Sequence, residues 1–224
     1  MNYYAHAYPF LDGDAGDDVF PYFLAGLAAP DWLTVVDRQC RVRLKHAEPL
    51  TLDADQVVAA VARGAAQHIR DDAQFHGTRP FAETALELSR RVRDVLGDDA
   101  TFRPGFLGHL LLEVLLDARL IAGDLYRLEA YYRLLDAVDP ARVESAINRM
   151  AIRPAERLAW FIGRFREARI LWDYLDDAKL LWRLNQVMGR VNLAQLPDEF
   201  AGILPEARRL VDDRAGELLE GLPA

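Results

Sequence analysis

The stretch that decides the fold lies near the middle of the chain and reads Pro104-Gly105-Phe106-Leu107-Gly108-His109-Leu110-Leu111-Leu112-Glu113-Val114-Leu115-Leu116-Asp117. Pro104 is a favoured first residue of a helix, and apolar side chains then cover almost every face of the turns that lead to Gly123. A helix that is apolar all round is buried by neighbours on several sides. We therefore predict a central buried helix over about residues 104–122.

Three ionisable residues interrupt this apolar helix, namely His109, Glu113 and Asp117. Each is four residues from the next, so on a helix that advances about 100° per residue they share one stripe. Ionisable groups on so apolar a helix are costly unless they are paired or bound to metal. The stripe predicts positive charge opposite it, supplied either by a metal ion or by an arginine such as Arg103 or Arg119.

A second stripe of the same kind lies on a helix that we expect from about Thr51 to His76. His68, Asp72 and His76 again follow one another at intervals of four residues. Imidazole and carboxylate are the usual ligands of Zn, Fe or Mn, although these histidines could instead only hydrogen-bond to neighbours. If the two striped helices face each other, five or six nitrogen and oxygen ligands converge on one or two ions, as in metal sites inside helical bundles.

The remaining pattern predicts further helices and no strands. A short helix over residues 20–29 should stop at Pro30, and Asp31 should open a second short helix. Helical spacing recurs throughout the rest of the chain, and core aromatics such as Trp160 and Trp182 fall within it. The fold class that we predict is all-α, a single-domain multi-helix bundle over residues 1–224, whose other segments are 81–96, 124–138, 139–151, 154–176, 177–190 and 197–219.

Composition narrows the function classes. At 224 residues with 51% hydrophobic and 28% charged residues, the chain fits one globular domain. Because Cys40 is its one cysteine, a metal must be held by His, Asp and Glu. The net charge of −8 disfavours nucleic acid, and the absence of a long apolar run predicts a cytoplasmic protein without a membrane span. Only residues 140–191 are net basic, with 10 Lys+Arg against 6 Asp+Glu.

The same elements carry a resemblance to known families. The pattern Gly64-x3-His68-x3-Asp72-x2-Phe75-His76, preceded by Phe23-Leu24-Ala25-Gly26 and Pro30-Asp31, resembles the zinc-dependent phospholipase C-like domain family of helical metal-dependent hydrolases. The opening Met1-Asn2-Tyr3-Tyr4-Ala5-His6 is similar to the start of acyl carrier protein phosphodiesterases, which are relatives of the HD-domain phosphohydrolases. The resemblance covers residues 1 to about 120. It departs from the phosphodiesterase pattern where Ile69-Arg70 stands in place of Arg-Arg.

This resemblance implies a set of metal-site positions. These positions are His6, Asp31, His46, His68, Asp72, His76, His109 and Glu113. Together they would hold one or two divalent ions (Zn, Mn or Fe). Asp71 is the candidate acid or base outside the ligand stripe, and would otherwise be a solvent-exposed residue. Arg70 or Arg119 could bind a substrate phosphate, or could equally form surface ion pairs.

We therefore expect a metal-dependent hydrolase that cleaves a phosphomonoester or phosphodiester through a metal-activated water. A small-molecule or lipid-headgroup phosphoester suits the acidic chain better than acyl carrier protein, which is itself acidic and could bind only the basic stretch 140–191. Two alternatives remain open at this point. One is a noncatalytic helical metal-binding or protein-interaction module, and the other is a di-iron protein, although its doubled Glu-x-x-His pattern is absent.

Overall fold

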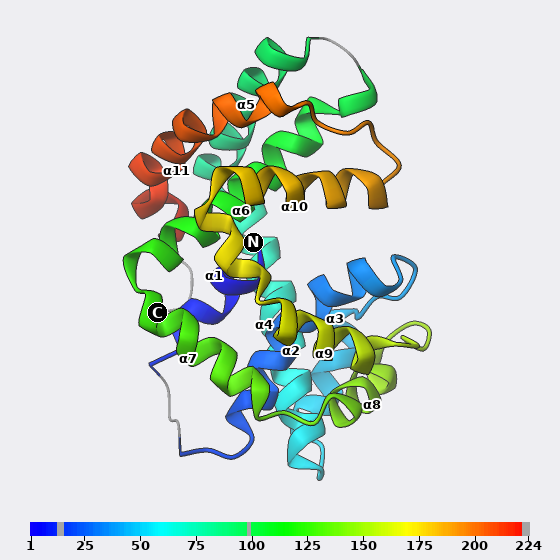
Figure 1. Cartoon of the computed structure of the whole chain (residues 1–224). Helices are drawn as coiled ribbons and strands as arrows, with labels where there is room; N and C mark the ends of the chain where they lie inside the picture. Colours follow the sequence, from blue (N-terminus) through cyan, green and yellow to red (C-terminus); the bar gives the residue numbers. More distant parts are fainter. Residues whose placement is uncertain (13–15, 98–99, 221–224) are drawn as a thin grey trace. The chain divides into compact units, whose positions relative to one another are not determined.

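The computed structural model describes residues 1–12, 16–97 and 100–220 (Figure 1). In these residues the regular backbone is helical, without a β-strand, and one isolated antiparallel bridge joins Val42 and Ala151. The all-α prediction is confirmed. Within the same residues, no helix combines the length and the apolar character needed to cross a membrane.

The chain divides into two compact units, which we name after their central helices. Among the described residues, the α6 unit contains 1–2, 74–123 and 170–220, and the α2 unit contains 3–73 and 124–169. Helix α4 (Gln56–His76) passes from one unit into the other near its carboxyl end.

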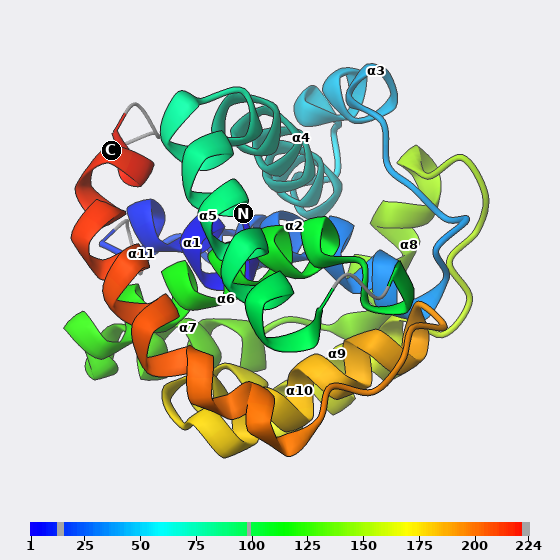
Figure 2. The same ribbon diagram turned by 90° about the horizontal axis from the view of Figure 1, so that it is seen from above.

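In the α2 unit, helix α2 (Phe20–Val36) packs against α4 and against four further helices (Figures 1 and 2). They are α1 (Tyr3–Ala7), α7 (Leu125–Asp136), α8 (Pro140–Met150) and α9 (Leu158–Ala168). Three short elements complete the unit, namely η1 (Tyr8–Phe10), α3 (Leu44–Ala47) and η2 (Glu48–Leu52).

Helix α2 corrects the prediction of two short helices, because it continues through Pro30 to Val36. A proline inside a helix removes one backbone hydrogen bond and crowds the preceding turn. Burial offsets that cost here, since Leu24 and Leu27 before the proline and Trp32 and Leu33 after it are all buried. Asp31 therefore lies inside a helix and does not cap one.

Helices α2 and α4 approach each other closely at two glycines. A Cβ atom on Gly64 would overlap the carbonyl oxygen of Phe23 and lie 2.7 Å from the backbone nitrogen of Leu27. A Cβ atom on Gly26 would overlap the carbonyl oxygen of Val61. The two backbones touch because neither glycine carries a side chain.

In the α6 unit, α6 (Pro104–Gly123) packs against α5 (Arg79–Leu96), α11 (Leu204–Leu219) and η4 (Ile170–Leu175). Eleven of its residues are buried, which confirms the predicted buried helix. Helix α10 (Asp177–Arg190, gold in Figure 1) contacts η4 and η5 (Asp198–Ile203). The remaining element is η3 (Ala100–Phe102).

Helix boundaries follow capping chemistry. The side chains of Asp124, Asp139 and Asp176 accept hydrogen bonds from the first backbone amides of α7, α8 and α10. The segment predicted over 154–176 is instead broken into α9 and η4 at Arg169, whose φ is 44°. Two of the predicted core aromatics are exposed, since Trp160 is 57% and Trp182 54% accessible.

We predict that Gly64→Ala destabilises the protein by about 1–3 kcal/mol, because the new methyl group forces α2 and α4 apart. Gly163→Ala is the matched control. A Cβ atom there would meet nothing within 4 Å inside α9, so helix propensity should leave stability unchanged or raise it by up to about 1 kcal/mol. Urea denaturation followed by circular dichroism measures both, and equal stability of the two variants would contradict the close contact.

Candidate metal centre

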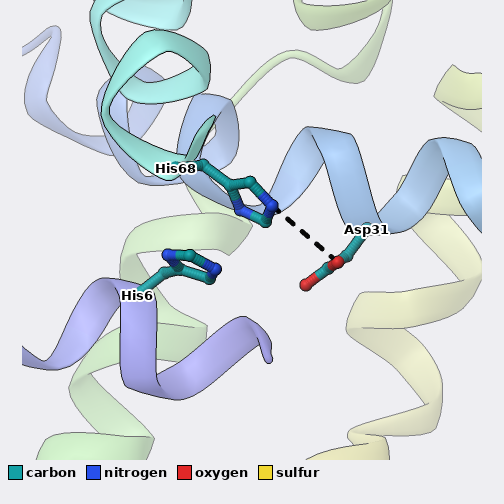
Figure 3. A group of neighbouring side chains, drawn as sticks. All are labelled: His6, Asp31 and His68. Carbon is teal, nitrogen blue, oxygen red and sulfur yellow. Dashed lines mark ion pairs between the residues drawn. The ribbon is translucent and has the colours of Figure 1, made fainter. Parts of the chain in front are cut away.

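Three residues from three helices of the α2 unit bring possible metal ligands together. His6 lies on α1, Asp31 on α2 and His68 on α4, and one ligand atom from each lies within 4.8 Å of the other two (Figure 3). Asp71 and Asp72 on α4 lie beside the histidines. We call these five residues the His–Asp cluster.

His6 is held in the cluster by the aromatic residues that precede it. Tyr3 packs on Phe165 with ring centroids 5.0 Å apart, and Tyr4 on Tyr131 at 5.9 Å. The His6 side chain is fully buried, and within the described residues neither ring nitrogen has a hydrogen-bond partner. Burial of an imidazole without such partners costs free energy of folding. A metal ion bound by a ring nitrogen of His6 would offset that cost.

His68 is oriented by a backbone carbonyl. Its Nδ1 lies 2.8 Å from the carbonyl oxygen of Leu27, which can only accept, so Nδ1 carries the proton and donates it. The Nε2 atom of a neutral His68 therefore presents a lone pair. That atom lies 3.4 Å from Asp72 Oδ2 and 4.0 Å from Asp31 Oδ1. A lone pair facing two carboxylates is repulsive unless a proton or a metal ion lies between them.

Both histidines face Asp72 at spacings that suit a shared ion. His6 Nε2 lies 3.3 Å from Asp72 Oδ1, and the His6 and His68 rings stack with centroids 3.8 Å apart. Two ligands about 2.0–2.1 Å from a tetrahedral zinc are about 3.4 Å apart. Direct hydrogen bonds between nitrogen and oxygen are shorter, about 2.7–3.2 Å. The spacing therefore fits ligands of one ion better than it fits direct hydrogen bonds.

The charge state of Asp72 supports metal binding. Burial alone would raise the pKa of Asp72, but the His6 and His68 imidazoles lower it far below the usual value for an aspartate. Its side chain is 30% exposed and that of Asp31 22%, against 4% for His68. The carboxylates therefore face outward, and the histidines lie behind them.

Asp71 is buried, with 3% of its surface exposed, so the alternative of a solvent-exposed residue does not describe it. Gln67 donates a hydrogen bond of 2.7 Å to its Oδ1, and its Oδ2 lies 3.6 Å from His6 Nδ1. A carboxylate behind a ligating histidine fixes the ring and raises its basicity. Asp71 is thus placed to orient His6 from the side opposite Asp72.

A second group of possible ligands lies in the α6 unit and contains His76, His109 and Glu113. Glu113 Oε1 accepts from His76 Nε2 at 2.9 Å, from His109 Nε2 at 3.0 Å and from the α-amino group of Met1 at 3.0 Å. Burial alone would raise the pKa of Glu113, but the amino group and the two histidines lower it. Unlike His6, this group already has hydrogen-bond partners at normal distances.

The predicted ligands therefore form two groups, one in each unit. Among the described residues, His46 belongs to neither. The two arginines suggested for substrate phosphate make ion pairs, Arg70 with Glu48 at 2.8 Å and Arg119 with Asp212 at 3.6 Å.

A pocket of about 410 Å³ opens next to the His–Asp cluster. Asp31, His68 and Asp72 line it together with Arg38 and Arg41, two residues that the sequence did not single out. No motif marks these arginines, because they lie in the loop after α2 and come near Asp72 only through the fold.

Comparison of the chain with models of protein families, with functionally described proteins and with solved structures gives no match.

We predict that the protein binds a divalent ion at the His–Asp cluster and that His68→Ala abolishes this binding. Asp71→Asn should weaken the affinity by about 10–100-fold, since it loosens His6 without removing a ligand. Calorimetric titration of chelator-treated protein with zinc or manganese, with elemental analysis of the product, measures both effects.

His46→Ala and His109→Ala serve as controls for this measurement. His46→Ala should leave the amount of bound metal unchanged. His109→Ala should affect only an ion held at the second group. If wild type and His68→Ala take up equal amounts of metal, the His–Asp cluster is not a metal site.

Proposed function

We propose that the protein is a metal-dependent hydrolase of a phosphoester, with the His–Asp cluster as its metal centre. The observation that carries the proposal is that the His6 and His68 Nε2 atoms lie 3.3 and 3.4 Å from one carboxylate, while the His6 ring nitrogens have no hydrogen-bond partner among the described residues. This donor set, of imidazole and carboxylate only, suits Zn, Mn or Fe. A divalent ion bound there would lower the pKa of a bound water and neutralise phosphoryl oxygens.

In this proposal the role of the surrounding residues is to hold the metal ligands in position. The Leu27 carbonyl fixes the ring of His68 by a hydrogen bond at Nδ1, and Asp71 lies 3.6 Å from Nδ1 of His6, so both Nε2 atoms are left for the ion. Asp31 and Asp72 add negative charge, and of the three candidate ligands that line the pocket they are more exposed than His68. A substrate in the pocket would therefore meet the ion on the side of the carboxylates.

The size of the pocket favours a small substrate. Its volume of about 410 Å³ falls in the range of about 300–1,000 Å³ that is typical of small-molecule sites. The net-basic stretch 140–191 offers little to an acidic protein such as acyl carrier protein. Most of its arginines already pair with carboxylates, namely Arg142, Arg149, Arg153, Arg164, Arg166, Arg169 and Arg183.

A noncatalytic metal-binding or interaction module would differ in one testable respect. A structural metal site is closed by protein ligands, whereas a catalytic site keeps a position open for water or substrate. The partial exposure of Asp31 and Asp72 toward the pocket favours the open form.

We expect the metal-loaded protein to hydrolyse p-nitrophenyl phosphate or bis(p-nitrophenyl) phosphate. Chelation should abolish the activity, and His68→Ala and Asp72→Asn should reduce it to the rate of metal in buffer, because each removes a ligand. Release of p-nitrophenol at 405 nm, an ordinary wavelength for this assay, measures the rate. Metal content is determined on the same samples.

Arg63→Gln is the control for this assay, because Arg63 is exposed on α4 and does not line the pocket. It should retain full activity. Hydrolysis that persists unchanged in His68→Ala would refute the proposal. A protein that binds metal at the cluster yet hydrolyses neither ester would favour the noncatalytic module.

A further inference from the structure

Two exposed arginines stand at the pocket without acidic partners. Arg38 and Arg41 both line the pocket that contains Asp31, His68 and Asp72. Neither makes an ion pair with any carboxylate in the described part of the chain, although the protein carries 35 acidic residues against 27 basic ones. Arg153 nearby does pair, with Asp37 at 3.4 Å. Free guanidinium groups beside a pocket are suited to bind an anion.

The loop that carries these arginines is fixed in place. The carbonyl oxygen of Arg41 accepts a hydrogen bond of 3.0 Å from the Ile152 amide, and Val42 forms the bridge with Ala151. Between the two arginines, the Cys40 thiol donates to the carbonyl oxygen of Arg153 at 3.1 Å and is 1% exposed. Burial, the largest influence, raises the pKa of Cys40 and keeps the thiol protonated. The backbone of residues 40–42 is therefore anchored, so Arg41 extends from a defined point.

The remaining pocket wall is mostly apolar, with Thr34 and Cys40 beside the apolar residues. Pro30, Leu33, Val42 and Ile69 contribute to it. The pocket thus combines three kinds of surface, namely the cluster carboxylates, the two guanidinium groups and an apolar wall. An anion that also carries a hydrocarbon portion complements the last two.

We propose that Arg38 and Arg41 are the anion-binding residues of this pocket and that they select a small phosphoester whose alcohol portion is apolar. The inference rests on the proposed function for the identity of the anion as a phosphoester. Guanidinium groups bind phosphate oxygens through paired hydrogen bonds. Arg38 and Arg41 take the role that the sequence suggested for Arg70 or Arg119.

Binding of stable phosphonates tests this inference apart from turnover. Hexylphosphonate and methylphosphonate are titrated calorimetrically into metal-loaded wild type, Arg38→Gln, Arg41→Gln and Arg63→Gln. We expect each pocket variant to bind hexylphosphonate about tenfold more weakly than wild type, since a hydrogen bond between charged groups is lost. Arg63→Gln, which removes the same charge outside the pocket, should bind like wild type. Hexylphosphonate should bind more tightly than methylphosphonate because its chain contacts the apolar wall.

Each result has a defined meaning. If all three arginine variants bind hexylphosphonate equally, the inference is wrong while the metal-dependent hydrolase can still stand. If the two phosphonates bind equally, the apolar part of the inference is wrong. If the protein takes up no metal, the proposed function fails, and the titration is repeated without metal. Binding that still depends on Arg38 and Arg41 then supports the anion site alone, and its absence overturns both.

Discussion

The candidate site depends on the close contact between α2 and α4 at Gly26 and Gly64. At this contact the Leu27 carbonyl of one helix reaches the Nδ1 atom of His68 on the other, at 2.8 Å. The same approach brings Asp31, one turn beyond Leu27 on α2, to 4.0 Å from His68 Nε2. A single pair of glycines thus fixes the orientation of the histidine and its distance from a carboxylate. A larger residue at either position would push α2 and α4 apart, and would thus increase the distance between the candidate ligands without replacing any of them.

The two groups of possible ligands differ in how their charges are balanced. In the α6 unit, one oxygen of Glu113 accepts from two imidazoles and an ammonium group, so hydrogen bonds alone satisfy it. In the α2 unit, the Nε2 atoms of two imidazoles face one carboxylate at distances longer than normal hydrogen bonds. Protonation of both rings would neutralise part of the charge but would leave His6 without a well-aligned acceptor. A divalent ion would satisfy both nitrogens and the carboxylate together, so the His–Asp cluster is the stronger of the two candidates.

Local patterns predicted much of this structure from the sequence, and the failures have physical causes. The apolar run around Leu111 predicted α6, and helical spacing predicted the segments of α7 and α8, because these signals act within a few residues. The prediction that α2 ends at Pro30 was wrong, because burial of the helix stabilises it by more than the one lost hydrogen bond costs. The sequence predicted that the stripe from His68 to His76 and the stripe over 109–117 converge on one or two ions, but His68 and His76 belong to different groups, because eight residues of helix rise about 12 Å. Ligands so far apart cannot share an ion. Arg38 and Arg41 could not be predicted, because only the fold places their loop beside α4.

If the cluster binds a metal ion and the pocket binds an anion, as we propose, the charges in the pocket make the two binding events cooperative. Asp31 and Asp72 are partly exposed to the pocket, and without a cation they would repel a phosphate. Exposed arginines offset this repulsion only in part, since the attraction between unit charges 4 Å apart in water is about 1 kcal/mol. A divalent ion held between the two carboxylates would balance their charge, which removes the repulsion, and would leave an open coordination position for a phosphate oxygen. Metal binding should therefore strengthen anion binding, and by linkage the anion should strengthen metal binding by the same factor. In this proposal the arginines would determine which anion is held and in what position, while the ion would remove the repulsion by the carboxylates.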